Sequence, residues 1–263
     1  MKLLMISIVL AASAGTALAD PPPDPVTTWS SELTERPLTL SSQLFEVRVD
    51  STSDSTVVGG WAELGVSAAY GVTDRFTLEV AHHCGDIGAC ADSSETALHA
   101  LYSIARSHAL EVAVLAGVER YENYFDFFES GTRRSLQLGA TFKLRAGQLA
   151  LVVAPSVNLA LGPGSDEYIP QVSTVKVPVT LEYQATSRIA AYARTGIGGS
   201  TADNSALLVG FAQSFSVPLA VGTLVDVTHR CDLGAELAYP YSLGPESTVF
   251  HDRQIDLYAQ LRW

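Results

Sequence analysis

The last nine residues of the chain constrain its fold more than any other stretch. In Ile255–Trp263 every odd position is apolar, and every even position except Tyr258 is strongly polar. Successive side chains of a β-strand point to opposite faces, so this segment predicts a strand with one apolar and one polar face. The same two-residue alternation returns through most of the chain, which predicts an all-β fold.

The first nineteen residues predict export from the cytoplasm. Lys2 precedes an apolar run, and the segment ends in Ala17-Leu18-Ala19. A basic start, a short apolar core and an A-x-A ending are the layout of a secretory signal peptide. The apolar run is shorter than the roughly 20 residues that a membrane-spanning helix needs. We therefore expect residues 1–19 to be a signal peptide that is cleaved after Ala19.

The mature chain divides into a short tail and one long β-region. Residues 20–37 contain five prolines and show no periodicity, so they predict an extended periplasmic tail. Residues 38–263 hold alternating segments of about ten residues, which is typical of a single antiparallel transmembrane β-barrel. The alternating segments are 38–49, 62–70, 76–81, 98–104, 110–118, 136–144, 149–159, 175–183, 189–197, 217–227, 233–239 and 255–263.

The connections between these segments alternate between short and long, as they do in outer-membrane barrels. The short ones are 71–75, 106–109, 145–148, 186–188 and 228–230. The long ones are 50–58, 83–95, 121–132, 162–173, 199–214 and 241–252. Together they predict about twelve strands with both chain ends on the periplasmic side. Ten or fourteen strands also fit, because 199–227 could hold a long strand or another hairpin.

A secreted β-sandwich is the alternative fold, because its strands also bury one face. The polar face of these segments is rich in small residues such as Gly65, Gly139, Gly222 and Gly234. Small side chains relieve crowding inside a narrow curved lumen, whereas a solvated outer face does not need them. This difference favours the barrel.

Composition excludes one class of partner. Hydrophobic residues make up 47% of the chain, charged residues 17%, and the net charge is −12 with a pI near 4.8. A protein of this charge has no basic stripe to neutralise phosphates, so we expect no nucleic-acid partner.

The signal peptide, the repeated hairpins, the turn Tyr70–Arg75 and the terminal Trp263 make the chain similar to bacterial outer-membrane β-barrel proteins of the small porin-like type. The resemblance is one of pattern and covers nearly all of the mature chain. It implies a place in the outer membrane, in contact with lipid and lipopolysaccharide. It also implies a C-terminal sorting signal that the barrel assembly machinery reads during biogenesis. The residues of that signal would be Leu257, Ala259, Leu261 and Trp263.

Two further sets of residues follow from the strand pattern. Aromatic side chains near strand ends on the apolar face predict girdles at the membrane interfaces. These are Tyr70, Phe76, Phe142, Tyr183, Tyr239 and Trp263. Charged side chains on the polar face predict a lumen that could set ion selectivity. These are Glu63, Glu79, Glu111, Lys143, Glu182, Arg194, Asp226, Glu236, Asp256 and Arg262.

The cysteines predict a loop disulfide and not a metal site. Five residues separate Cys84 from Cys90 in an exported loop, a spacing that suits a disulfide and does not match zinc sites. We expect Cys231 to be unpaired. No metal ligand set and no cofactor is predicted. The short-turn regions carry five arginines, among them Arg106 and Arg145. We expect their side chains to be solvated at the membrane edge.

The sequence leaves several functions open. The acidic lumen suggests a narrow, mildly cation-preferring channel for small hydrophilic solutes. A lumen plugged by internal ion pairs is an equally good interpretation, and the protein would then be a structural or adhesive surface barrel. An enzyme is not expected, because the rim candidates His99, His251 and Asp252 have no serine beside them in a recognisable motif.

Overall fold

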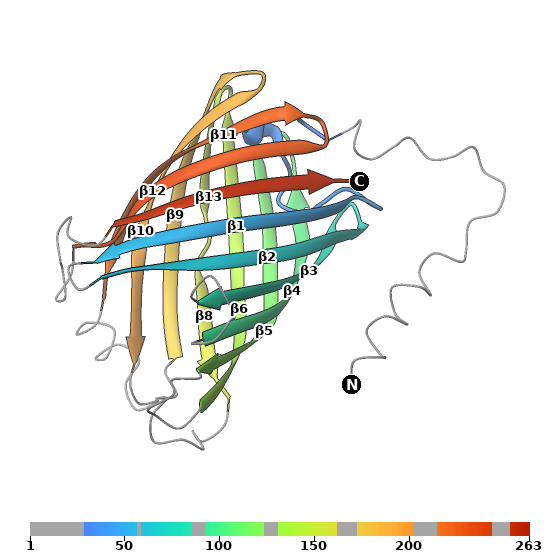
Figure 1. Ribbon diagram of the computed structural model, residues 1–263. Helices are drawn as coiled ribbons and strands as arrows, with labels where there is room; N and C mark the ends of the chain where they lie inside the picture. The colour runs from blue at the N-terminus through green and yellow to red at the C-terminus, as the bar shows by residue number, and fades with distance from the viewer. Residues whose placement is uncertain are drawn as a thin grey trace.

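The structure is a computed structural model that describes residues 29–56, 59–85, 93–123, 131–161, 173–201, 215–243 and 253–263. Its ordered elements are one short 3-10 helix and thirteen strand segments (Figure 1). They are η1 (Leu33–Glu35), β1 (Phe45–Thr56), β2 (Gly59–Thr73), β3 (Phe76–Gly85), β4 (Ser93–Arg106), β5 (Leu110–Asn123), β6 (Gly131–Ala146), β7 (Leu149–Val153), β8 (Ser156–Ala160), β9 (Ser173–Thr186), β10 (Ile189–Thr201), β11 (Val217–Thr228), β12 (Cys231–Leu243) and β13 (Arg253–Arg262).

The strands form a closed antiparallel barrel. Each strand pairs with its neighbour in sequence, and β1 pairs with β13 from Glu46–Arg262 to Ser55–Arg253, which closes the sheet. The segments β7 and β8 both pair with β6 and β9, so they form one strand that is interrupted at Pro155. Proline has no N–H to donate to a ladder, which explains the break. The prediction of twelve strands is therefore confirmed.

The hairpin turns lie where the alternation placed them. The five short connections are residues 74–75, 107–109, 147–148, 187–188 and 229–230. The expectation of a long connection over 50–58 is wrong, because β1 continues to Thr56 and is paired with β2 along this stretch. Its Ser, Thr and Asp side chains suggested a loop, but pairing on both sides keeps the backbone extended. The sequence left the number of strands open over 199–227. In the described residues after Thr201, this region contains the strand β11.

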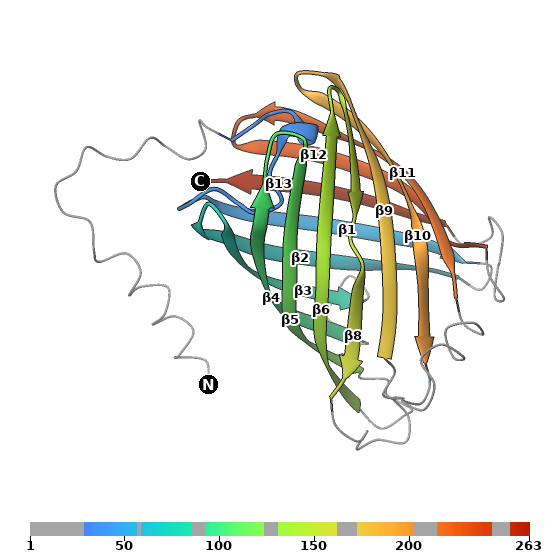
Figure 2. The ribbon, with the colours of Figure 1, turned by 180° about the vertical axis from the view of Figure 1, so that it is seen from behind.

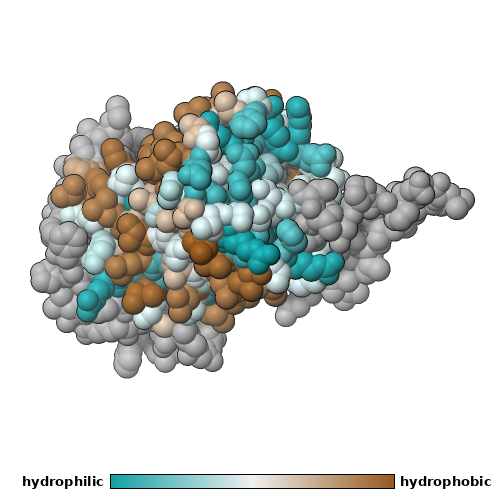
Figure 3. All heavy atoms as spheres, turned by 90° about the horizontal axis from the view of Figure 1, so that it is seen from above, coloured by the Kyte–Doolittle hydropathy of each residue, from teal (hydrophilic) through white to brown (hydrophobic). Residues whose placement is uncertain are grey.

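The outward face of the barrel is apolar. Leu, Val and Ile side chains of successive strands are exposed there, for example Val221 at 58% and Leu257 at 57% of their full surface. Exposed apolar bands of this size are unusual in water and are what a membrane-facing surface requires. Seen from above, the molecule has brown apolar side chains over much of one side and a teal polar area next to them (Figure 3). No helix in the described ranges is long and apolar enough to cross a membrane.

Residues 29–44, which we call the plug segment, fold into the barrel. Figures 1 and 2 show this blue segment among the strands, near the end where the short turns lie. Trp29, Leu40 and Leu44 form a buried apolar cluster against Ala69. The prediction of an extended tail is wrong for residues 29–37, since η1 lies there; residues 20–28 are outside the described ranges. The first predicted strand, 38–49, begins only at Phe45, because residues 38–44 belong to the plug segment.

Candidate functional site

The plug segment is held by buried charges on β12 and β13. The guanidinium of Arg36 donates to both oxygens of Asp232, at 2.5 and 3.1 Å. Arg262 donates to the same carboxylate at 2.5 Å and to Glu46 at 2.7 Å. The guanidinium of Arg262 also lies over the ring of Trp29, 5.7 Å from its centroid. Asp232 is fully buried, and charge-assisted bonds on both its oxygens offset the cost of removing it from water.

A second anchor joins the plug segment to β4, β5 and β6. Glu111 is fully buried and receives ion pairs from Arg106 at 2.8 Å and Arg145 at 3.0 Å. The backbone N–H of Leu38 also donates to Oε2 at 3.1 Å, and the hydroxyl of Ser103 donates to Oε1 at 3.3 Å. Arg145 also donates to the carbonyl oxygen of Thr34 at 3.0 Å. These contacts satisfy carbonyl and amide groups that an irregular segment would otherwise leave unpaired.

The third anchor connects the segment to β6, β9 and the first short turn. Lys143 donates to the carbonyl oxygen of Leu33 at 2.9 Å and forms an ion pair with Glu182, also at 2.9 Å. The backbone N–H of Leu40 donates to Thr77 at 2.8 Å. The hydroxyl of Thr39 donates to the carbonyl oxygen of Asp74 at 2.9 Å. The segment therefore makes polar contacts with several strands on opposite sides of the lumen, near its short-turn end.

The ten charged residues predicted for the lumen all lie on inward positions of their strands, but they do two different things. One group meets the plug segment or lies deep beside it and is buried. It consists of Glu111, Lys143, Glu182, Asp226 and Arg262. The other group lies further along the strands, toward the long-connection end, and Glu236 in this group is also buried. It consists of Glu63, Glu79, Arg194, Glu236 and Asp256.

The structure gives Glu111 two basic partners that the strand pattern did not indicate. Arg106 and Arg145 belong to short-turn regions, where their interpretation was solvation at the membrane edge. Their long side chains instead reach back to Glu111 and the plug segment. Arginine can bridge several acceptors at once because its planar group carries five N–H donors.

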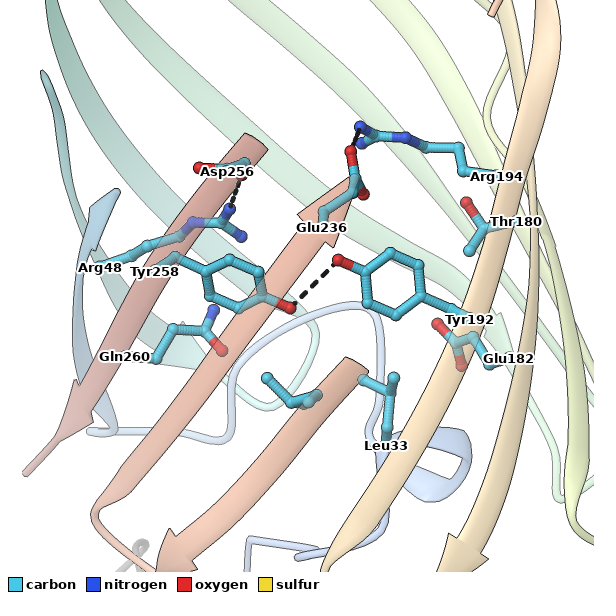
Figure 4. Close-up of a pocket in the computed structure, with 11 residues that line it drawn as sticks. Leu33, Arg48, Thr180, Glu182, Tyr192, Arg194, Glu236, Asp256, Tyr258 and Gln260 are labelled. Atoms are coloured by element: carbon cyan, nitrogen blue, oxygen red, sulfur yellow. Dashed lines mark hydrogen bonds and ion pairs between the residues drawn. The ribbon is translucent and has the colours of Figure 1, made fainter. Parts of the chain in front are cut away.

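A cavity of about 230 Å³ lies in the lumen directly beside the plug segment. Figure 4 shows Leu33 of that segment at one side of it, and Tyr192 and Tyr258 pointing toward each other across its wall. Their hydroxyl oxygens are 3.4 Å apart. The lining residues are Leu33, Arg48, Thr180, Glu182, Tyr192, Arg194, Leu224, Glu236, Asp256, Tyr258 and Gln260.

Two glycines allow these tyrosine rings to lie flat on the barrel wall. A Cβ atom on Gly222 would be 2.3 Å from Cζ of Tyr192, and one on Gly234 would be 2.0 Å from Cζ of Tyr258. Gly222 and Gly234 are the cross-strand partners of Tyr192 and Tyr258 respectively. The small residues on the polar face therefore make room for specific rings in the lumen.

We expect Gly234→Ala to destabilise the barrel by about 1–3 kcal/mol, since the new methyl group would overlap the Tyr258 ring and force it from the wall. The measurement is the temperature at which the purified protein loses its folded, heat-modifiable migration. Gly198→Ala is the matched control, because its Cβ would have no neighbour nearer than 3.7 Å. Equal transition temperatures for both variants would show that the ring is free to move aside.

The other predicted groups are placed as follows. The six girdle residues, Tyr70, Phe76, Phe142, Tyr183, Tyr239 and Trp263, are on outward positions of their strands. Trp263 packs against Phe45 with ring centroids 5.7 Å apart, and the two backbones exchange hydrogen bonds at 3.0 and 2.9 Å. Leu257, Ala259 and Leu261 lie on the same outward face of β13. Their roles as girdle and sorting signal stay predictions.

Cys84 is disulfide-bonded and Cys231 is free. Cys90, the partner that the sequence predicts, lies outside the described residues. Within the described ranges there is no group of three or more His, Cys, Asp or Glu side chains placed to hold a metal ion.

Of the three residues considered for a hydrolase, the structure describes His99. His251 and Asp252 lie outside the described residues. His99 faces Glu119 at 3.8 Å, and Glu119 accepts hydrogen bonds from Ser135 at 3.1 Å and Asn158 at 2.8 Å. A serine nucleophile would need to bond the histidine directly. Here Ser135 donates to the carboxylate instead.

Comparison with known proteins places this architecture among porins. No protein-family model matches the chain, and no curated protein matches it either. Among solved structures, the NanC porin matches with a TM-score of 0.60 and 10% identity, over 82% of this chain and 98% of that one. The KdgM porin matches with a TM-score of 0.55 and 7% identity, over 81% and 98%, and so does its complex with disordered oligogalacturonate. At these identities the likeness shows the fold, which is the closed barrel of bacterial outer-membrane porins.

Proposed function

We propose that this protein is an outer-membrane channel for small hydrophilic solutes, that it prefers cations mildly, and that its own plug segment closes the periplasmic end at rest. The observation that carries the proposal is the lumen itself. An inward face of charged and polar residues encloses a cavity, and the segment beside it is held by polar contacts together with the small apolar cluster of Trp29, Leu40 and Leu44. The polar contacts can be exchanged for contacts with water when the segment moves, so the cost of exposing apolar surface is confined to this small cluster.

The cation preference rests on the charges away from the plug segment. Among the inward positions there whose side chains the structure describes, seven carboxylates stand against four basic side chains, an excess of three negative charges. The carboxylates are Asp50, Glu63, Glu79, Glu95, Glu119, Glu236 and Asp256, and the basic residues are Arg48, Arg133, Lys176 and Arg194. In a narrow lumen with low-dielectric walls, such an excess attracts cations more strongly than it would on an open surface.

We expect the double substitution Glu63→Gln, Glu79→Gln to reduce cation preference, because it removes two of the three excess negative charges. The measurement is the reversal potential of single open channels across a KCl gradient, which should move toward zero. Glu111 is left out because it anchors the plug segment. Glu122→Gln, on the outward face of β5, is the control with the same chemistry. An unchanged reversal potential in conducting channels would place Glu63 and Glu79 outside the permeation path.

The second candidate function is a non-conducting surface barrel. The density of the buried network favours it, since Glu111, Asp232 and Arg262 are all at most 2% exposed. A barrel that never opened would need such a network only for stability. Planar-bilayer recording separates the two candidates: discrete current steps support the channel, and silence of every plug-segment variant at high protein load supports the structural barrel.

A further inference from the structure

The pocket beside the plug segment contains an aromatic ring between two carboxylates. In the barrel register, Glu182 pairs with Tyr192, Tyr192 with Gly222, and Gly222 with Glu236. Neighbouring strands are about 4.8 Å apart, so this row sets one carboxylate on each side of the ring that covers Gly222. Asp256 is the next residue along the row, beside Glu236.

In the other half of the same pocket, a side chain of the protein itself places a cation over a tyrosine ring. The guanidinium carbon of Arg48 lies 4.1 Å from the centroid of the Tyr258 ring, and the same group is 3.5 Å from Asp256 and 3.5 Å from Asp50. A cation over a tyrosine ring, next to carboxylates, gains from both the ring quadrupole and the charges. The protein therefore fills this half of the pocket with its own cation.

The half around Tyr192 has the ring and two carboxylates but no cation over the ring face, although Lys143 pairs with Glu182 at 2.9 Å. Guanidinium groups in the described part of the chain lie over Tyr258, Tyr121 and Trp29, and none over Tyr192. Arg194 pairs with Glu236 from the side, and its side chain is 48% exposed. Figure 4 shows the Tyr192 ring facing the open space between the side chains that line the pocket.

The charges around the pocket also favour a positive ligand. Among the residues that line the pocket, three carboxylates, Glu182, Glu236 and Asp256, face two basic groups, Arg48 and Arg194. The difference is one negative charge. Arg194 is half exposed and can turn toward water, but Glu236 is buried, so a ligand cation has to replace Arg194 beside that carboxylate.

From this geometry we infer that the pocket binds small organic cations, ammonium or guanidinium compounds, with the charged head over the Tyr192 ring between Glu182 and Glu236. The inference rests on the proposed function, because it names the solute class that a cation-preferring channel would hold in its lumen. The pocket is then a solute-binding site next to the plug segment.

The test is direct binding of tetramethylammonium to the purified protein, followed by saturation-transfer NMR of the methyl signal. The detergent must be uncharged and carry no ammonium headgroup, because such a headgroup would compete for the site. We expect saturable binding of tetramethylammonium and none of tert-butanol, which is neutral and of similar size. Tyr192→Phe keeps the ring and should bind like the wild type.

Tyr192→Leu removes the ring face and should weaken binding about tenfold, which corresponds to the roughly 1.4 kcal/mol expected of a partly desolvated cation–π contact. Glu236→Gln should also weaken binding, and it decides the matter if Tyr192→Leu fails to fold. Equal binding of tert-butanol overturns the inference, and so does unchanged binding of tetramethylammonium in whichever of Tyr192→Leu and Glu236→Gln folds. Binding is measured without ion flow, so a protein that binds but never conducts would contradict the channel and leave the site standing.

Discussion

Replacing Arg36 with alanine is expected to raise solute flux through the barrel roughly 100-fold. Arg36 joins the plug segment to Asp232, and removing one partner of a buried ion pair costs about 3 kcal/mol or more. Asp232 keeps its contact with Arg262, so the loss falls on the plug segment and not on the barrel wall. A shift of 3 kcal/mol raises the population of the released state by about two orders of magnitude. The measurement is the swelling rate of proteoliposomes in isotonic arabinose.

Arg75→Ala is the matched control for this variant. Arg75 lies exposed in the short turn between β2 and β3, so its loss changes the net charge equally without touching the plug segment. Swelling at the wild-type rate in both variants would mean that residues 29–44 do not obstruct the path. Faster swelling in both would point to a general effect of charge.

Replacing Trp263 with aspartate is expected to abolish assembly in the outer membrane. Trp263 closes the seam between β13 and β1, where it packs on Phe45 and pairs with its backbone. A carboxylate at this outward position would face lipid or the interface, and the resemblance to outer-membrane barrels implies that a sorting signal would be lost as well. The measurement is the amount of heat-modifiable protein in the outer-membrane fraction.

Trp263→Phe is the conservative control, because it keeps an aromatic ring against Phe45. It should assemble at close to the wild-type level. Unchanged outer-membrane levels of Trp263→Asp would show that the terminal ring is needed neither for closure nor for sorting.

Most of the barrel could be predicted from sequence, because each strand has one face against apolar surroundings and one face in the lumen. That asymmetry forces a period of two, and the register follows once the five short turns are placed. The break at Pro155 could also be expected from the missing N–H. The extension of β1 through Asp50–Thr56 could not, since its composition resembles a loop and only pairing with strands distant in sequence keeps it extended.

The plug segment was missed for a physical reason. An irregular segment inside a lumen has no periodicity, because each of its residues meets a different strand. Arg36, Thr39 and Leu44 carry no pattern that separates them from a tail. A signal was present on the barrel side: Arg106 and Arg145 sit near Glu111 and Lys143 at the short-turn end, more charge than that end needs for solvation. Charged groups in excess of what solvation needs at one end of a lumen indicate an internal partner.

Single-channel recording of the wild-type chain and Arg36→Ala side by side in planar bilayers, under a KCl gradient, tests the central claim most directly. The account predicts rare, brief openings for the wild type and sustained steps of the same size for the variant. Both should have a reversal potential on the cation-selective side. Equal open times in the two proteins would contradict closure by residues 29–44, and the absence of steps in both would contradict the channel itself.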